Sequence, residues 1–375
     1  MRNTVSKFSL MMIAAVLLLG AQFAAPRANA LDLGNLESVG LGFSLDTTYQ
    51  YVSNGEVGEG ITERGLYPEH NDFSIDAFTL SLEKVPTVGE GVADLIGFRA
   101  DILFGEQAER LGFGFGSTAD SGDPTDGAVS PYQAYINVLV PSEAGGLNIY
   151  VGQFTTLAGW ELIEAKDNTN ITRSLLFYRI PFAHSGVRAT FSAGSLDFAL
   201  GLSNDWDALD DDNDGKTFES QIALNFANDG WLGVTGYFGD TDGETRSLIT
   251  VVGTMTLMDK LTLIADFEYT SHEAGGDRWG FAGYAIMSLS DAVSIALRGE
   301  YVDDSEILDD DGVMLGVELY EFTSTLILTP FESMGNFETR LEYRYDKADG
   351  NDTYFAEEED QQHGFAVQLL YWLEV

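Results

Sequence analysis

Apolar and polar residues alternate along most of this chain. From position 365 to the end, every odd-numbered residue is apolar: Phe365, Val367, Leu369, Tyr371, Leu373 and Val375. Between 337 and 345 the aromatic and aliphatic residues alternate instead with Glu338, Arg340, Glu342 and Arg344. A period of two is typical of a β-strand with one apolar face and one polar face. The pattern therefore predicts an all-β protein.

The alternating segments number sixteen, and several have the ~9–11 residues that a tilted strand needs to cross a bilayer. The segment 313–329 changes phase near Tyr320–Phe322, which predicts a bulge or a misplaced boundary there. The segments are 39–52, 73–84, 93–105, 132–140, 147–155, 184–192, 195–204, 216–227, 231–240, 247–258, 260–271, 278–289, 292–302, 313–329, 335–346 and 361–375.

The connectors between these segments differ in length in a regular way. Short connectors lie at 141–146, 193–194, 228–230, 259 and 290–291. The longer ones are 53–72, 106–131, 156–183, 205–215, 272–277, 303–312 and 347–360. Short periplasmic turns and long external loops are typical of transmembrane barrels. An even number of strands then puts both ends of the chain on the side of the short turns.

Aromatic residues support the same fold. They gather at the ends of the odd-numbered segments, which would all meet the external membrane interface: Tyr49, Tyr51, Phe104, Phe154, Phe238, Tyr269, Tyr301, Tyr343 and Tyr345. Girdles of aromatic side chains at the lipid interface are a feature of such barrels.

The polar faces of the segments carry many charges, namely Arg99, Asp101, Arg188, Asp266, Glu268, Arg298, Glu300, Glu338, Arg340, Glu342 and Arg344. In the dry core of a soluble sandwich, such groups would cost several kcal/mol each unless paired. In a water-filled lumen they cost little, and sixteen strands enclose an aqueous channel. We therefore predict a transmembrane antiparallel β-barrel of about sixteen strands.

Residues 1–30 read as a secretory signal peptide. Arg2 and Lys7 precede a short apolar run at 8–20, and Ala28-Asn29-Ala30 has the form of a cleavage site. A membrane anchor is the alternative, but the run is shorter than the ~20 residues of a spanning helix. We expect residues 31–375 to form a single outer-membrane barrel.

Charge and composition exclude several functions. The chain has 60 acidic and 19 basic residues, a formal charge of −41 and no cysteine. Nucleic-acid binding is excluded, because phosphate contacts need Lys and Arg. The four histidines are scattered, and no Gly-x-Ser-x-Gly turn is present. We therefore expect neither an enzyme nor a cofactor.

The connector 156–183 differs from the other long ones, because it mixes apolar and charged residues instead of being rich in Asp and Gly. We expect it to fold into the lumen and narrow the pore, although a partner contact or an external cap would also fit. The expected constriction residues on it are Glu161, Glu164, Lys166, Asp167 and Arg173. Wall charges facing them would be Arg99, Arg188, Arg298, Glu338, Arg340 and Arg344.

The acidic loops suggest a second kind of chemistry. Asp210, Asp212 and Asp214 take the first three ligand positions of a calcium loop, with Gly215 at position six, but Gln221 stands where that loop needs Glu. A solvated acidic loop and a weak external Ca²⁺ site both remain open. Such loops could also bind divalent cations that bridge to lipopolysaccharide.

Residues 151–191 resemble the central segment of the beta-barrel porin-2 (OmpL-like) family. The matching features are Gly152-Gln153-Phe154, Gly159, Glu161, Glu164–Asn168, Thr172–Phe177, Pro181-Phe182 and His184–Arg188, followed by the step Asn204–Asp207. The resemblance implies an outer-membrane porin-like channel. By the wider likeness to sixteen-strand porins, it also implies a homotrimer whose fifth connector folds into the pore.

We therefore expect a passive outer-membrane channel for small hydrophilic solutes and ions. The acid excess favours cations, although the lumenal charges counted above are nearly balanced. The alternative is a closed structural or adhesin-type barrel that binds divalent cations or lipopolysaccharide through its acidic external loops.

Overall fold

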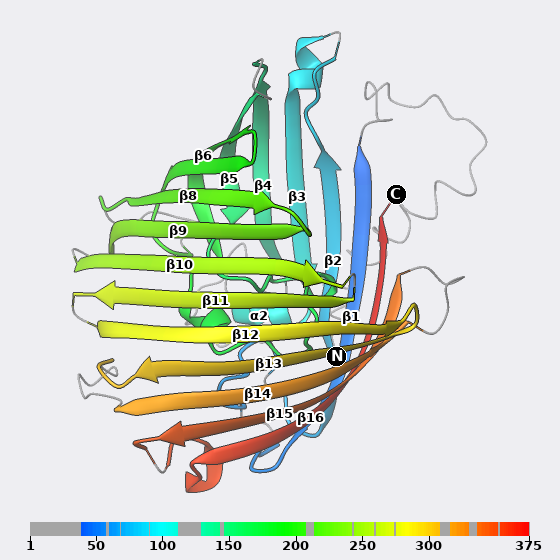
Figure 1. Ribbon diagram of the computed structural model, residues 1–375, viewed down its shortest axis with the longest axis vertical. Coiled ribbons are helices and arrows are strands. Elements are labelled where there is room, and N and C mark those ends of the chain that lie inside the picture. Colours follow the sequence, from blue (N-terminus) through cyan, green and yellow to red (C-terminus); the bar gives the residue numbers. More distant parts are fainter. Residues whose placement is uncertain are drawn as a thin grey trace, which may run out of the picture. The chain divides into compact units, whose positions relative to one another are not determined.

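The sixteen alternating segments form sixteen antiparallel strands that close into one barrel (Figure 1). Each strand pairs with the next, and β1 pairs with β16 from Gly42↔Glu374 to Val52↔Gly364. Closure leaves no unpaired strand edge, which a sheet in hydrocarbon requires. The computed structural model describes residues 39–57, 60–67, 69–89, 91–111, 129–142, 146–207, 214–241, 244–258, 260–273, 275–307, 316–329, 336–351 and 353–374. The expected signal peptide, residues 1–30, lies outside the described residues.

The bounds of the strands are close to the expected ones. They are β1 (Gly40–Val52), β2 (Asp72–Lys84), β3 (Ile96–Phe104), β4 (Val129–Val140), β5 (Leu147–Thr155), β6 (Ala183–Ala193), β7 (Leu196–Ser203), β8 (Thr217–Phe226), β9 (Gly230–Thr241), β10 (Glu244–Leu257), β11 (Leu261–His272), β12 (Gly276–Ser290), β13 (Val293–Asp304), β14 (Val317–Leu328), β15 (Phe337–Asp349) and β16 (Gln361–Glu374). The short helices among the described residues are α2 (Glu106–Leu111), η2 (Val92–Leu95), η3 (Ala165–Asp167), η4 (Leu176–Arg179) and η6 (Ala356–Glu358). No helix in the described part of the chain is long and apolar enough to cross a membrane.

Two details of the expected pattern were wrong. β14 pairs with β13 and β15 without a register shift, so there is no bulge at Tyr320–Phe322. The apolar residues change from odd to even positions there because Val317 and Leu319 are apolar although they lie on the inner face. They pack in one cluster with Leu175 and Leu176. The connector expected at 272–277 is also short, since β11 ends at His272 and β12 begins at Gly276.

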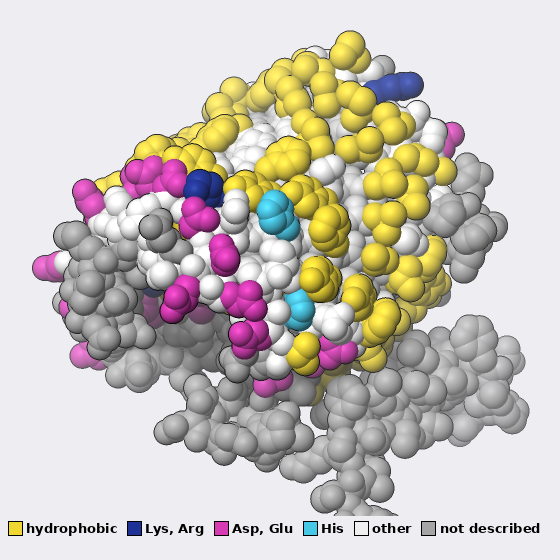
Figure 2. Space-filling view, turned by 90° about the horizontal axis from the view of Figure 1, so that it is seen from below, with side chains coloured by type: hydrophobic (Ala, Val, Ile, Leu, Met, Phe, Trp, Pro, Cys, Tyr) yellow, Lys and Arg dark blue, Asp and Glu magenta, His cyan; other side chains and the backbone are white. Residues whose placement is uncertain are grey.

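The outer face of the barrel is apolar, as the alternation predicts. In Figure 2, hydrophobic side chains cover much of the visible wall, and acidic side chains gather at one rim. Aromatic residues at the ends of neighbouring strands contact one another on this face, with ring centroids 5.2 Å apart for Trp279–Tyr301 and 5.1 Å for Tyr301–Tyr320. Phe154 is an exception to the expected girdle. It is 2% exposed and lies on the inner face of β5, opposite in phase to the exposed Val151, where its ring packs against the guanidinium of Arg188 at 4.0 Å.

The inside of the barrel is filled by connectors. Residues 60–67 reach inward, where Arg64 pairs with Asp346 of β15 at 2.7 Å. Helix α2 buries Ala108 and Leu111 in an apolar cluster with the connector that follows β5. The hydrophobic core therefore lies within the lumen, between the wall and the connectors folded into it.

Candidate channel constriction

The connector 156–182 between β5 and β6 folds into the lumen, and we call it the inward loop. Glu342, on the inner face of β15, anchors this loop to the wall. The Glu342 carboxylate accepts hydrogen bonds from the amides of Ile171 (2.6 Å) and Thr172 (2.9 Å), and also from the hydroxyls of Thr172 (2.5 Å) and Thr325 (2.7 Å). Four donors on one buried carboxylate satisfy its acceptor positions and fix the loop against the wall.

Arg298 on β13 holds the same stretch by its charge. The guanidinium is 1% exposed and lies 2.8 Å from Glu161 of the loop, 2.9 Å from Glu300 and 3.2 Å from Glu321. It also donates to the carbonyl of Thr172 at 2.7 Å. Glu161 also accepts a hydrogen bond from the backbone amide of Ser174 at 2.6 Å. These two expected site residues, Glu161 and Arg298, thus join the loop to the wall.

Three more expected site arginines bind backbone carbonyls of the loop. Arg173 donates to the carbonyls of Leu162 and Ile163, both at 2.9 Å, and so holds the shape of the loop itself. Arg344 donates to the carbonyl of Arg173 at 2.6 Å, and Arg340 to that of Ala165 at 3.0 Å.

All three arginines are buried, each with 2% or less of its surface exposed. The water-filled lumen expected around the wall charges is not what Arg340 and Arg344 meet, because the inward loop covers them and supplies backbone carbonyls as partners.

Two other expected wall residues also have protein partners. Arg188 pairs with Glu219 of β8 at 2.6 Å. Glu338 pairs with Arg340 at 2.6 Å. Neither Arg188 nor Glu338 lines the cavity described next.

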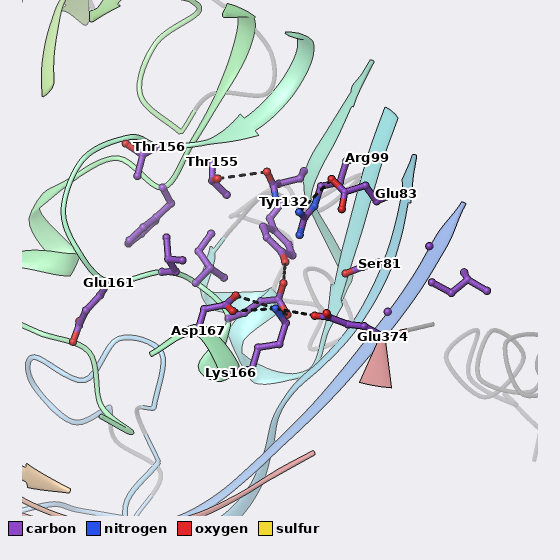
Figure 3. Close-up of a pocket in the computed structure, with 18 of the residues that line it drawn as sticks. Ser81, Glu83, Arg99, Tyr132, Thr155, Thr156, Glu161, Lys166, Asp167 and Glu374 are labelled. Atoms are coloured by element: carbon purple, nitrogen blue, oxygen red, sulfur yellow. Dashed lines mark hydrogen bonds and ion pairs between the residues drawn. The ribbon is translucent and has the colours of Figure 1, made fainter. Parts of the chain in front are cut away.

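A cavity of about 750 Å³ lies between the inward loop and the wall of β1–β5 (Figure 3). The expected residues Arg99, Glu161, Glu164, Lys166 and Asp167 line it. Gly40, Ser81, Glu83 and Glu374 line it as well, and these lie where β1 begins and where β2 and β16 end. The cavity is therefore at the end of the barrel that carries the chain termini. Five of its lining residues are acidic and two are basic.

The charges around this cavity are close to one another. The Lys166 ammonium lies 3.0 Å from Asp167, 3.7 Å from Glu374 and 3.8 Å from Glu164, and Figure 3 shows it between Asp167 and Glu374. Tyr132 donates to Glu164 at 2.6 Å. Burial raises the pKa of Glu164, which Lys166 and Tyr132 only partly oppose. Across the cavity, Arg99 pairs with Asp101 at 2.6 Å and lies 3.7 Å from Glu83.

Comparison with known proteins decides the family. The model of the family described as putative beta-barrel porin-2, OmpL-like, matches residues 38–373, nearly the whole chain. The chain belongs to this family. Among curated proteins, none matches the chain at a significant level.

Solved structures show the same fold in outer-membrane channels. An anion-selective porin from Comamonas acidovorans superimposes with a TM-score of 0.61 at 11% identity, over 90% of this chain and 99% of the other. The outer-membrane channel DcaP of Acinetobacter baumannii gives 0.58 at 14% identity, over 89% and 97%. The trimer form of OmpT of Vibrio cholerae gives 0.58 at 12%, over 89% and 99%. This porin is thus a sixteen-strand barrel that resembles outer-membrane channels.

Glu83 and Glu374 of this porin line the cavity, but sequence reasoning did not select them as site residues. Both lie on polar faces of alternating segments, so the period-two pattern placed them in the lumen. Nothing in the sequence showed that the ends of β2 and β16 lie beside Lys166, because that contact depends on how the loop folds.

The expected calcium loop lies mostly outside the described residues, since Asp210 and Asp212 are not among them. Asp214 is described and exposed. In the part of the porin that the structure describes, no three His, Cys, Asp or Glu side chains are placed as a metal-binding group.

Asp207, just beyond β7, provides a pH-dependent anchor for the end of the inward loop. Its Oδ1 accepts the amides of Phe182 (2.5 Å) and Ala183 (2.9 Å), and burial raises its pKa from 3.8 to about 6. Because the folded state then holds the proton more tightly, stability falls as pH rises from about 4 to about 6.

Asp207→Asn keeps the acceptor oxygen and removes the titration. We expect the free energy of unfolding of the variant, measured by urea titration between pH 4 and pH 7, to fall less with rising pH than that of the wild type. If it falls as steeply as in the wild type, Asp207 is not the group that titrates.

Proposed function

We propose that this protein is a passive diffusion channel of the outer membrane for small hydrophilic solutes and ions, narrowed by the inward loop. The observation that carries the proposal is the charged cavity between the loop and β1–β5, within a barrel of porin fold. Glu161, Glu164, Lys166 and Asp167 would shape the passage from the loop side, and Arg99 from the wall. Arg173, Arg298, Arg340 and Arg344 would act by holding the loop.

We further propose that the channel prefers cations. Much of the net charge of −41 lies on loops, where salt screens it beyond ~8–10 Å. The charges at the cavity matter more, and there acidic residues outnumber basic ones. The anion-selective porin from Comamonas acidovorans has the same fold, so the fold alone does not set the sign of selectivity.

Neutralising the cavity acids tests this preference. We expect Glu83→Gln, Asp167→Asn and Glu374→Gln together to move the reversal potential in a KCl gradient toward anions. The matched control is Asp229→Asn with Asp291→Asn, two exposed turn residues that do not line the cavity. An unchanged potential in the cavity variant, or an equal shift in the control, would contradict a selectivity set at the cavity.

Liposome swelling with neutral sugars of increasing size tests the passage itself. Entry of small sugars with a sharp size limit supports the diffusion channel. If liposomes with demonstrably inserted protein stay closed to every sugar and ion, the closed structural barrel is correct instead. The connectors that fill much of the lumen make that outcome a real alternative.

Export and assembly complete the proposal. We propose that residues 1–30 are removed as a signal peptide, which N-terminal sequencing of the native protein would verify by a start at Leu31. We also propose a homotrimer, in line with the trimer form of OmpT of Vibrio cholerae. Light scattering on the native protein extracted in mild detergent tests this, and a monomer would overturn it.

A further inference from the structure

The inward loop presents an apolar side chain to the cavity. Leu162 lines the cavity and is 45% exposed, whereas Ile163, Leu175 and Leu176 of the same loop are buried. Its backbone is held on both sides, because the amide donates to Oδ1 of Asn168 at 2.9 Å and the carbonyl accepts from Nδ2 of Asn168 at 2.8 Å. The fixed backbone therefore displays this leucine in the lumen instead of packing it against the wall.

Phe182, at the end of the inward loop, adds to the apolar side of the cavity. It lines the cavity, is half-buried and packs on Phe177 with the ring centroids 4.8 Å apart. The face of an aromatic ring attracts a cation that lies within ~6 Å of its centroid. The cavity thus offers apolar surface together with charge, and an inorganic ion makes no use of the apolar part.

The charges that are accessible from the cavity are mostly negative. The side chains of Glu83, Asp167 and Glu374 are 40%, 39% and 68% exposed. Those of Arg99 and Lys166 are only 27% and 16% exposed. Three carboxylates share Lys166 and two share Arg99 (Figure 3). An anionic solute would have to displace these carboxylates, whereas a cationic solute gains contacts with them.

Two glycines of β1 leave room between two of the exposed carboxylates. The register places Glu374 of β16 opposite Gly42, and Glu83 of β2 opposite Gly40. The strands on either side of β1 are ~10 Å apart, because neighbouring strands are ~4.8 Å apart. A Cβ on Gly42 would lie 3.3 Å from Cβ of Ser81 and 3.8 Å from Cγ of Glu374, so the glycine keeps this space open. A small cationic group can therefore approach both carboxylates.

We propose that this cavity selects small organic cations with a primary ammonium group on a short apolar body, the class of the alkylamines. The ammonium group has three donors and binds the exposed carboxylates of Glu83 and Glu374. The apolar body packs on Leu162 and Phe182. A volume of about 750 Å³ lies within the ~300–1,000 Å³ of sites for small molecules. This inference rests on the proposed channel function and names its substrate class.

Block of the potassium current by n-alkylammonium ions in planar bilayers tests this substrate class. From ethyl- to hexylammonium, we expect each added methylene to tighten the block about two- to fourfold, because each methylene that leaves water favours binding. Alkyl carboxylates of the same length should block at least about tenfold more weakly, because they meet like charges. Equal block by the carboxylates, or block that does not depend on chain length, would overturn the proposal.

Two variants separate the apolar part of the site from the charged part. Leu162→Ala should flatten the dependence of block on chain length. Glu83→Gln with Glu374→Gln should weaken the block by every alkylammonium ion to a similar extent and keep that dependence. The control is Leu200→Ala, which changes an exposed leucine on the outer face of β7 and should behave as the wild type does. If Leu162→Ala keeps the wild-type dependence on chain length, the proposal is wrong.

Calorimetry distinguishes a failure of this proposal from a failure of the channel function. A bilayer that stays sealed around inserted protein would contradict the channel, but hexylammonium can still be titrated into the refolded mature protein. Saturable binding that Glu83→Gln with Glu374→Gln removes would support the site even in a closed barrel. If the wild type does not bind hexylammonium, the substrate class is wrong, whether or not the protein conducts potassium.

Discussion

Removing the centre of the inward loop is expected to raise the single-channel conductance roughly severalfold, because this segment occupies the lumen. A suitable variant replaces residues 160–177 with a short Gly-Ser linker. The β-ladder that closes the barrel does not include these residues. Arg298 and Glu342 lose their loop partners, but in the opened lumen they gain water, which makes their charges inexpensive.

The matched control inserts the same linker into the two-residue turn Gly194-Ser195, at the other end of β6 from the inward loop. This turn joins β6 to β7 and lies outside the lumen. Its conductance should equal that of the wild type. If the loop variant inserts into planar bilayers and conducts no better than the control, the loop does not narrow the passage.

Replacing Arg298 with alanine should be the most destabilising single change. It leaves Glu161, Glu300 and Glu321 buried without their shared counter-charge. Breaking a buried ion pair from one side typically costs about 3–5 kcal/mol. The free energy of unfolding, measured by urea titration in lipid vesicles, should fall by that amount.

Arg278→Ala is the control, because Arg278 is another inner-wall arginine. Its side chain is 28% exposed and lies 3.8 Å from Asp304. A partly exposed pair at that distance is worth about 0–1 kcal/mol. If both variants lose the same free energy of unfolding, Arg298 does not have a special role in holding the loop to the wall.

Much of the fold could be predicted from the sequence, because the membrane imposes it. Lipid on one side and polar groups on the other require a period of two, and unpaired backbone groups in hydrocarbon require closure. Sixteen segments and their approximate bounds follow from these demands. The inward course of 156–183 follows instead from the composition of that connector. The apolar residues of that connector, such as Leu175 and Leu176, indicated a packed rather than a solvated loop, and both are buried.

The roles of single charged residues could not be predicted in the same way. Alternation places Arg298, Arg340 and Arg344 on the inner face, but it does not say that loop carbonyls and carboxylates cover them. Phe154 ends a strand as an interface aromatic does, but it alternates with the exposed Val151 and therefore lies on the inner face, where its ring packs against Arg188. Such contacts depend on the three-dimensional path of the loop, which leaves no periodic trace in the sequence.

Single-channel recording tests the central claim most directly. The refolded mature protein would be inserted into a planar bilayer with a KCl gradient across it. We expect discrete conductance steps and a reversal potential of the sign that cation preference gives. A bilayer that stays sealed, although the protein in it is shown to be inserted and folded, would contradict an open channel and leave a closed barrel.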